Sequence, residues 1–304
     1  MKKFRFIVVV LFFLGLNSQC FSKEPMISVV LSTNLDFYKE VADGFKEYLT
    51  GKGAAVKFDE YSLAGQQDKD VFAKVSSTNP DLILTVGEAG LKSAKQFTSG
   101  VPVVFSMVFN TIGLLDQNTT GVSVELPTDM KIAAIKKVMP NAKTIGLLYS
   151  PKSEASYREI VAECVKQGLV AKGASVNSDA EFSAALNSVF EGSDCFLVIM
   201  DTKIYFSQTI KMLLLEAIKN KIPVVGLSSF FTKAGALVSF DCDYKDIGVQ
   251  AGEISSKILA GEKAGTIKPM RPRKYKYSLN LATAEKIGIT LSPSVVKDAA
   301  DVVK

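Results

Sequence analysis

Short apolar runs rich in β-branched residues alternate along this chain with longer segments whose apolar residues recur every three or four positions. The short runs are typical of buried strands, and the longer segments predict amphipathic helices. This alternation favours a parallel sheet covered by helices on both faces. The predicted strands are residues 27–31, 56–58, 82–86 and 101–105, and the predicted helices are residues 35–49 and 89–97.

The same alternation returns in the second half of the chain. Four segments match earlier ones in the same order, at offsets between 113 and 121 residues. Such offsets are far longer than the period of a solenoid repeat, so they indicate two duplicated lobes. We expect each lobe to be a doubly wound α/β sheet, with Gly53 and Gly173 ending the first helix of each. The matched pairs are 27–33 with 144–150, 51–56 with 171–176, 81–86 with 194–199, and 101–104 with 222–225.

The N-terminus has the pattern of a secretory signal peptide. Lys2, Lys3 and Arg5 precede an uncharged apolar run at residues 7–16. This run is shorter than the about 18 residues that a membrane-spanning helix needs. We therefore predict that residues 1–22 direct export and are removed, with an uncleaved N-terminal anchor as the alternative.

Two cleavage positions fit the preference for small residues, one after Cys20 and one after Ser22, and we favour the second. Cys20 also raises the alternative of a lipid anchor. Lipoprotein signals usually have an aliphatic residue and a small residue where this chain has Asn17 and Gln19. The prediction is therefore a periplasmic protein, with lipidation at Cys20 less favoured.

Net charge gives no reason to expect a polyanionic partner. Removing residues 1–22 takes away three positive charges and no negative one, so the net charge falls from +5 to +2. A nearly neutral domain has little attraction for nucleic acid or anionic lipid. The remaining cysteines, Cys164, Cys195 and Cys242, allow at most one disulfide bond, and we expect buried free thiols.

The composition argues against an enzyme. The chain has no histidine, which excludes Ser-His and Cys-His nucleophiles and the usual zinc sites. It also lacks the Gly-x-Ser-x-Gly, P-loop and Cys-x-x-Cys motifs. Chemistry by a carboxylate pair such as Glu88 and Asp201 is the alternative that composition leaves open. We expect no catalytic residue, no cofactor and no metal.

Ligands of open α/β sheets bind beyond the carboxyl ends of the strands, and two lobes that face each other form a cleft there. The residues after the predicted strand ends are mostly hydroxyls, aromatics and carboxylates, which suit reversible binding of a small molecule. The candidate ligand-binding residues are Ser32, Asn34, Phe37, Gly87, Glu88 and Ser106 from the first lobe, and Tyr149, Ser150, Ser153, Asp201, Thr202, Ser228 and Ser229 from the second.

Structural roles compete with ligand contact at several of these positions. Serines at strand ends often cap helices, and this alternative applies to Ser32, Ser150 and Ser153. Phe37 fits core packing, and Glu88 fits a solvated helix face. Asp201 follows the apolar run 196–200, where a capping carboxylate also fits, but we favour it as an anion that contacts the ligand.

Several segments resemble one known family. They are residues 81–87, 101–105 and 140–151 and, most specifically, Asp243-Tyr-Lys-Asp-Ile-Gly-Val-Gln-Ala-Gly252, 257–261 and 279–288. Together they resemble the ABC transporter substrate-binding protein family that includes the tryptophan- and tyrosine-binding importer components. The resemblance covers essentially the whole chain after residue 22.

The resemblance implies a type I periplasmic-binding-protein fold, in which several segments cross between two lobes joined by a hinge. The N-terminal lobe is then residues 23–122 plus about 243–264, and the C-terminal lobe is residues 123–242 plus about 265–304. The expected function is extracytoplasmic delivery of a small molecule, such as an amino acid or aromatic compound, to an ABC permease and its ATPase. We expect a monomer that closes on its ligand and meets the membrane only through the permease.

The resemblance also implies that Asp201 contacts an amino group of the ligand, and that Ser228 and Asp243 lie in the pocket or at its rim. Glu88 and the loop 110–113 depart from the family pattern near the cleft, so the identity of the ligand stays open. An alternative function also stays open. The same clamshell fits an extracytoplasmic sensor that reports to a separate membrane signalling partner.

Overall fold

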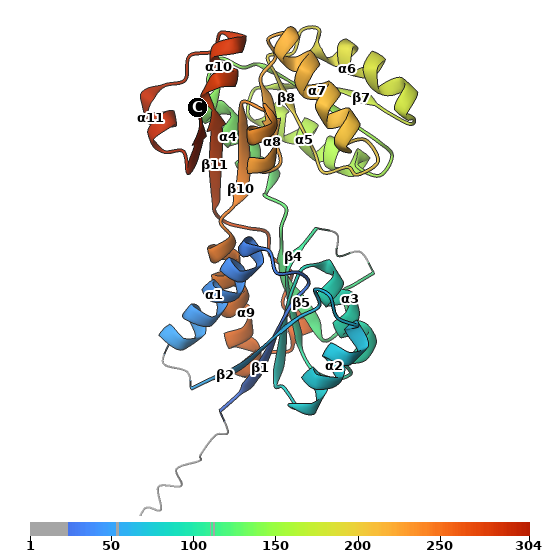
Figure 1. The fold of residues 1–304 in the computed structure, drawn as a ribbon, viewed down its shortest axis with the longest axis vertical. Helices are drawn as coiled ribbons and strands as arrows, with labels where there is room; N and C mark the ends of the chain where they lie inside the picture. The colour runs from blue at the N-terminus through green and yellow to red at the C-terminus, as the bar shows by residue number, and fades with distance from the viewer. Residues whose placement is uncertain (1–23, 53–54, 110, 112) are drawn as a thin grey trace, which may run out of the picture.

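The computed structural model describes residues 24–52, 55–109, 111 and 113–304. The predicted signal peptide and Gly53 lie outside these residues. Figure 1 shows two α/β lobes stacked end to end and joined by crossing segments. The carboxyl ends of the parallel strands in each lobe point toward the other lobe, so both sheets present their ligand-binding edges to the junction.

The first lobe is built on a five-stranded parallel sheet in the order β2-β1-β3-β4-β5. Its core has two parts, because helices cover both faces of the sheet. Val41 and Phe45 of α1 pack with Ile247 of α9 on one face, and Phe72 of α2 packs with Leu91 of α3 on the other. The elements are β1 (Met26–Leu31), α1 (Asp36–Gly51), β2 (Lys57–Ser62), α2 (Asp68–Ser77), β3 (Leu82–Val86), α3 (Glu88–Phe97), β4 (Val103–Val108), β5 (Thr119–Ser123) and α9 (Tyr244–Leu259).

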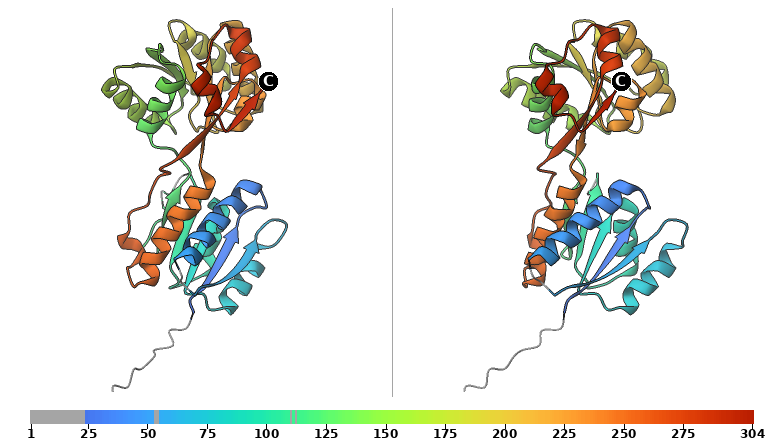
Figure 2. Two further views of the ribbon diagram at one scale, coloured as in Figure 1. Left: turned by 90° about the vertical axis from the view of Figure 1, so that its left-hand side faces the viewer. Right: turned by 60° about the vertical axis from the view of Figure 1, so that its left-hand side comes forward.

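Helix α9 lies against α1 although the two are far apart in the sequence (Figures 1 and 2). Glycines allow the close approach. A Cβ atom at Gly44 would lie 2.2 Å from the carbonyl oxygen of Lys245, and one at Gly248 would lie 2.0 Å from that of Val41. This packing fixes α9 to the first lobe, so its first residue, Tyr244, stands at the junction with the second.

The second lobe has a seven-stranded sheet in the order β12-β11-β10-β9-β8-β6-β7, with β11 antiparallel to β10 and the other pairs parallel. Its elements are α4 (Thr128–Val138), β6 (Thr144–Tyr149), α5 (Glu154–Lys166), β7 (Val170–Ser175), η1 (Asp179–Glu181), α6 (Phe182–Phe190), β8 (Cys195–Leu197), α7 (Ser207–Lys219), β9 (Val224–Gly226), α8 (Ser229–Ala234), β10 (Val238–Cys242), β11 (Tyr275–Asn280), α10 (Leu281–Ile287), α11 (Pro293–Lys297) and β12 (Asp301–Val303). The 3₁₀ turn η2 (Ala264–Thr266) lies beside β5 on the first lobe, before the last crossing segment.

The order β7-β6-β8-β9-β10 repeats the order β2-β1-β3-β4-β5 of the first lobe. Both are the doubly wound order in which the strand sequence reverses beside the first strand. The predicted fold class, two doubly wound α/β lobes, is confirmed. Three of the four matched segments fall on equivalent strands, β1 with β6, β3 with β8 and β4 with β9.

The fourth match was wrong. Gly51 ends helix α1, whereas residues 171–175 belong to strand β7, whose true counterpart is β2. Gly173 therefore does not end a helix. It lies in β7 beneath Tyr157, where a Cβ atom would come 2.3 Å from the ring. The glycine that follows helix α5 is Gly168, whose φ of +74° lies in the left-handed region that favours glycine.

Three chain segments cross between the lobes, and hydrogen bonds join them side by side. Cys242 Sγ contacts the carbonyl oxygen of Val124 at 2.9 Å, which ties the crossing after β10 to the crossing after β5. The third crossing contacts both of the others. Ser123 N–H donates to the Met270 carbonyl at 2.9 Å, and Asp243 N–H donates to the Lys274 carbonyl at 3.1 Å.

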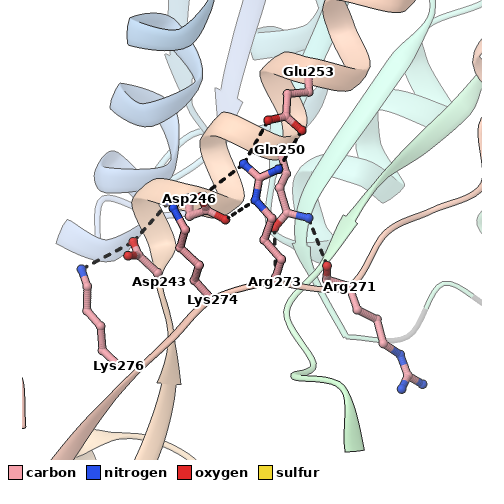
Figure 3. Close-up of polar contacts among 8 residues, drawn as sticks. All are labelled: Asp243, Asp246, Gln250, Glu253, Arg271, Arg273, Lys274 and Lys276. Atoms are coloured by element: carbon pink, nitrogen blue, oxygen red, sulfur yellow. Dashed lines mark hydrogen bonds and ion pairs between the residues drawn. The ribbon is translucent and has the colours of Figure 1, made fainter. Parts of the chain in front are cut away.

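Ion pairs hold the third crossing segment to helix α9 (Figure 3). Arg273 bonds Asp246 at 2.9 Å and Glu253 at 3.0 Å, and Lys274 contacts Asp246 at 2.8 Å. Burial alone raises the pKa of Asp246, but these two cations outweigh it and lower that pKa below its usual value. Lys276 reaches Asp243 at 3.5 Å. The crossing is therefore anchored to the first lobe up to the start of β11.

Candidate ligand-binding site

A cavity of about 100 Å³ lies where the crossing segments meet the two lobes. Most of its lining is apolar, and four residues give it polar or charged groups. The lining comprises Phe109, Val124, Leu126, Leu197, Val198, Met200, Gly226, Leu227, Phe240 and Cys242, together with Glu125, Lys131, Asp241 and Tyr244. Both lobes and two crossing segments contribute to the lining. A molecule bound there therefore contacts both lobes and two of the segments about which the lobes would rotate.

Bends in the backbone bring the first lobe to this cavity. Met107, within β4, has a φ of +58°, and the pairing of β4 with β5 shifts register between Ser106 and Val108. A bulge of this kind bends a strand and re-aims the residues that follow it. Phe109, the next residue after β4, lines the cavity.

Two polar groups of the cavity form an ion pair. Lys131 Nζ, from helix α4, lies 3.3 Å from Glu125 Oε1 in the crossing after β5. The two side chains are only 15% and 22% exposed, so neither can rely on water for most of its solvation. Their opposite charges compensate each other.

The other two polar groups form a hydrogen bond between the lobes. Tyr244, the first residue of α9, donates its hydroxyl to Asp241 Oδ1 at 3.1 Å. Asp241 stands near the end of β10, and its Oδ2 accepts the backbone N–H of Ser229, at the start of α8, at 2.8 Å. Burial raises the pKa of Asp241, and burial also raises that of Tyr244.

Asp201 lies elsewhere, in a cluster with two of the predicted serines. Its Oδ2 accepts the hydroxyls of Ser150 and Ser153, each at 2.6 Å, and the N–H of Ser150 at 3.1 Å. Its Oδ1 accepts the N–H of Lys203 at 2.9 Å. Burial acts to raise the pKa of Asp201, but these hydrogen bonds together hold it below its ordinary value. The side chain is 5% exposed and binds the β6–α5 turn to the loop after β8.

The predicted serines of the first lobe also bond within the protein. Ser32 Oγ accepts the N–H of Gly90 at 2.8 Å, so this serine caps α3, the helix that follows the neighbouring strand. Ser106 is fully buried, and its hydroxyl donates to the Thr85 carbonyl at 3.2 Å. Asn34 is exposed and accepts the hydroxyl of Ser62 at 2.6 Å.

Three further predicted residues lie on the edge of the first lobe. The ring of Phe37 is 5.2 Å from that of Tyr244, so it stands behind the cavity rather than in its lining. Gly87 has a φ of +99°, and a Cβ atom there would come 2.6 Å from both Ser32 Oγ and the ring of Tyr38. Glu88 is half-exposed at the start of α3 and pairs with Lys92 at 2.5 Å.

The remaining predictions lie on the second lobe. Tyr149 stacks on Tyr157 with ring centres 4.1 Å apart, and Thr202 is exposed. Ser228 is the N-cap residue of α8. Ser229 does not line the cavity, but its N–H donates to Asp241, which does. The structure brings together Ser150, Ser153 and Asp201. None of the candidates predicted from sequence, all of which are among the described residues, lines the cavity. Their contact with a ligand stays a prediction.

Sequence reasoning missed Asp241, Tyr244, Glu125 and Lys131. Three of these follow or end the fifth strand of a lobe, β5 or β10, and the predictions named at most four strands in each lobe. A usable signal was present. Asp241 follows the mostly apolar run Ala-Leu-Val-Ser-Phe at residues 236–240, much as Asp201 follows the apolar run 196–200. A search for a fifth strand in each lobe would have included Asp241 among the residues at strand ends.

The described part of the chain offers no group of three or more His, Cys, Asp or Glu side chains placed to hold a metal ion. Within that same part, no helix combines the length and the apolar character required to cross a membrane. Cys164, Cys195 and Cys242 are buried and free, which confirms the prediction of free thiols. Burial raises the pKa of Cys164 to about 11, which leaves its thiol protonated and unreactive.

Comparisons with known proteins agree with this architecture. The family model described as "ABC transporter substrate binding protein" matches residues 26–303. A tyrosine-binding protein of Clostridioides difficile is 26% identical over 244 residues, which are 76% of this chain and 69% of that protein.

Two solved structures share the fold. One is the ligand-free, open structure of a substrate binding protein with adhesive properties from Clostridium difficile, at a TM-score of 0.74 and 20% identity, with 92% of this chain and 99% of that chain covered. The other is an ABC domain from Streptococcus pneumonia in complex with L-Trp, at a TM-score of 0.60 and 24% identity, with 92% and 100% covered.

Proposed function

We propose a solute-capture function for this chain, which belongs to the family of ABC transporter substrate binding proteins. This is a family of binding proteins and not of enzymes. The proposed ligand is an amino acid with a large apolar or aromatic side chain, held in the cavity between the lobes. The proposed partners are an ABC permease and its ATPase, to which the chain delivers the ligand outside the cytoplasmic membrane.

The observation that carries the ligand class is the lining of the cavity. Ten of its residues offer apolar side chains or a glycine, and the four polar groups are two carboxylates, one lysine and one tyrosine hydroxyl. Sites for small molecules commonly combine apolar walls with a few placed polar groups that orient the ligand. A relative that binds tyrosine and a structural neighbour that holds L-Trp support the same class.

The proposed mechanism is closure of the two lobes about the crossing segments. A ligand in the cavity meets Leu197 and Leu227 of the second lobe as well as Phe109 and Tyr244 of the first. It gains more contacts when the lobes approach, and a ligand shifts a conformational equilibrium only through such a difference in affinity. The permease would then recognise the orientation of the closed lobes.

Thermal unfolding in the presence of each amino acid tests the ligand class. A ligand that binds only the native state raises the melting temperature, and we expect tyrosine and tryptophan to give the largest increases. Solution scattering on the same samples should show a smaller radius of gyration with ligand. If no amino acid raises the melting temperature, the proposed ligand class is refuted.

Uptake of the labelled amino acid by cells with and without the gene tests the transport role. Loss of uptake in the deletion strain supports delivery to a permease. Normal uptake together with a lost transcriptional response to the amino acid would instead support the sensor. Mass spectrometry of the mature N-terminus tests the predicted removal of residues 1–22.

A further inference from the structure

We propose that Asp241, and not Asp201, receives the ammonium group of the ligand and so gives the cavity its preference for solutes that carry an amine. The inference rests on the function proposed above, because it assigns a role within the same cavity. The residue that recognises the amino group is then Asp241 near the end of β10, forty residues after Asp201, which the sequence analysis favoured.

The position of Asp241 is the first support. It lies near the carboxyl end of β10, where the chain leaves the second lobe for α9, and it lines the cavity. Its neighbours in the lining include Val198, Leu227 and Phe240, which are apolar. A carboxylate at the edge of an apolar cavity matches a ligand that carries a cation on an apolar body.

Unused hydrogen-bonding capacity is the second support. An ionised carboxylate has about four acceptor sites. Asp241 accepts from two protein donors, the N–H of Ser229 and the hydroxyl of Tyr244. Asp201 accepts from four, the N–H and hydroxyl of Ser150, the hydroxyl of Ser153 and the N–H of Lys203. Asp241 therefore keeps about two acceptor sites for N–H donors of an ammonium group, and Asp201 keeps none.

Missing charge compensation is the third support. No ion pair among the described residues includes Asp241, although Lys276 stands directly opposite it on β11. Figure 3 shows that Lys276 directs its ammonium group to Asp243, at 3.5 Å. Lys233 of α8 acts on Asp241 only from a distance, and the one lysine of the cavity, Lys131, is paired with Glu125. A bound ammonium group supplies the missing cation.

A purely structural role for Asp241 is the competing explanation. Its two hydrogen bonds link α8 of the second lobe to α9 of the first, so the residue could simply join the lobes. The two roles differ in what the loss of charge does. Loss of the ammonium site weakens only a ligand that carries an amine. Loss of the link between the lobes weakens every ligand of the cavity, with or without an amine.

Calorimetry with two ligands and matched variants separates these roles. The ligands are tyrosine and its deaminated analogue, hydroxyphenylpropionate, which lacks only the ammonium group. The variants are Asp241→Asn and Asp201→Asn, which remove one charge each at nearly constant size. Asp241→Glu, which keeps the charge, serves as the conservative variant.

We expect the wild type to bind tyrosine about 10- to 100-fold more tightly than the analogue, the usual range for a hydrogen bond to a charged group. Asp241→Asn should remove this preference and leave the affinity for the analogue within about twofold. Asp241→Glu and Asp201→Asn should both keep the preference, even where their absolute affinities fall.

Three results would overturn the inference. An equal loss of both ligands in Asp241→Asn would assign Asp241 to the link between the lobes. Loss of the preference in Asp201→Asn would place the ammonium group at Asp201. A wild type that binds both ligands equally would show that no carboxylate of the protein recognises the ammonium group. These results differ from failure of the proposed function, in which the wild type binds neither ligand.

Discussion

Asp201 and Asp241 each follow a largely apolar, strand-like run in the second lobe, and the two runs differ mainly in the one serine, Ser239, that precedes Phe240. Their surroundings differ. Asp201 is almost fully buried and saturated by four donors from its own lobe, and its pKa is lowered. Asp241 lines a cavity with two donors and no ion-pair partner within the described residues, and its pKa is raised by burial.

The difference shows how one sequence pattern serves two purposes. A carboxylate whose acceptor sites are filled by the protein gains nothing from a ligand, and its contribution goes to holding two loops together. A half-buried carboxylate with free acceptor sites carries a desolvation cost that a cationic ligand relieves. What separates the two is the supply of donors from neighbouring turns, here Ser150 and Ser153 beside Asp201.

The largest expected effect is on stability. Asp201→Ala leaves the donors of Ser150 and Ser153 without their acceptor, and we expect the free energy of unfolding to fall by about 3 kcal/mol. Asp241→Asn should lower it less, by about 1 kcal/mol, because the amide keeps one of the two acceptor oxygens and so loses one of the two hydrogen bonds. Urea denaturation of both variants measures the two changes. Equal losses would erase the contrast between the two carboxylates.

Acid should separate the same two groups. Because burial raises the pKa of Asp241 in the free protein, the affinity for tyrosine is greatest above that pKa and falls as the pH drops through it, by about tenfold per pH unit. Two groups beside it do not interfere. Lys233 acts on Asp241 only as a nearby positive charge, and burial raises the pKa of Tyr244, which keeps its hydroxyl protonated. As the pH falls, binding at Asp241 is therefore lost before Asp201 takes up its proton.

The stability contributed by Asp201 follows a lower window. Its folded pKa lies below the unfolded value of about 3.9, so its contribution is present above that value and is lost as the pH falls toward the folded pKa. Asp241 has the opposite sign, since its raised pKa makes the free protein more stable as it takes up its proton. Calorimetry and urea denaturation as a function of pH should show binding weaken before Asp201 stops contributing. An affinity that stays flat down to acid unfolding would contradict this order.

The smallest expected effect concerns a third carboxylate, on the other lobe. Glu88 pairs with Lys92 on the half-exposed surface of α3, and such surface pairs contribute little. We expect Glu88→Gln to change the affinity for tyrosine by less than about twofold and the free energy of unfolding by less than about 0.5 kcal/mol. Calorimetry and urea denaturation measure both quantities. A tenfold loss of affinity would mean that Glu88 reaches the ligand after closure.

The fold could be predicted from the sequence because its elements are local and repeated. Buried parallel strands such as β1 and β3 are continuous apolar runs, and the same runs return as β6 and β8. The prediction failed where the repeat relied on small residues. Gly51 ends α1, whereas Ala171, its partner in the match, lies inside β7, and composition alone cannot tell a helix end from an edge strand.

The site was harder to predict because it depends on strand order and on side-chain partners. Ser32 caps α3 only because β1 lies beside β3, a neighbour that the chain reaches some fifty residues later. Strand β5 reads Thr-Thr-Gly-Val-Ser, which lacks an apolar run, so the crossing that carries Glu125 gave no strand signal. The saturation of Asp201 by its serines was likewise invisible without the β6–α5 turn in place.

A crystal structure of the protein with bound tyrosine tests the central claim most directly. The account predicts that the ligand lies in the cavity beside Phe109 and Leu197, with its ammonium nitrogen about 2.8 Å from a carboxylate oxygen of Asp241. It also predicts that Asp201 still holds Ser150 and Ser153. An ammonium nitrogen bound to Asp201, with those serines displaced, would contradict it.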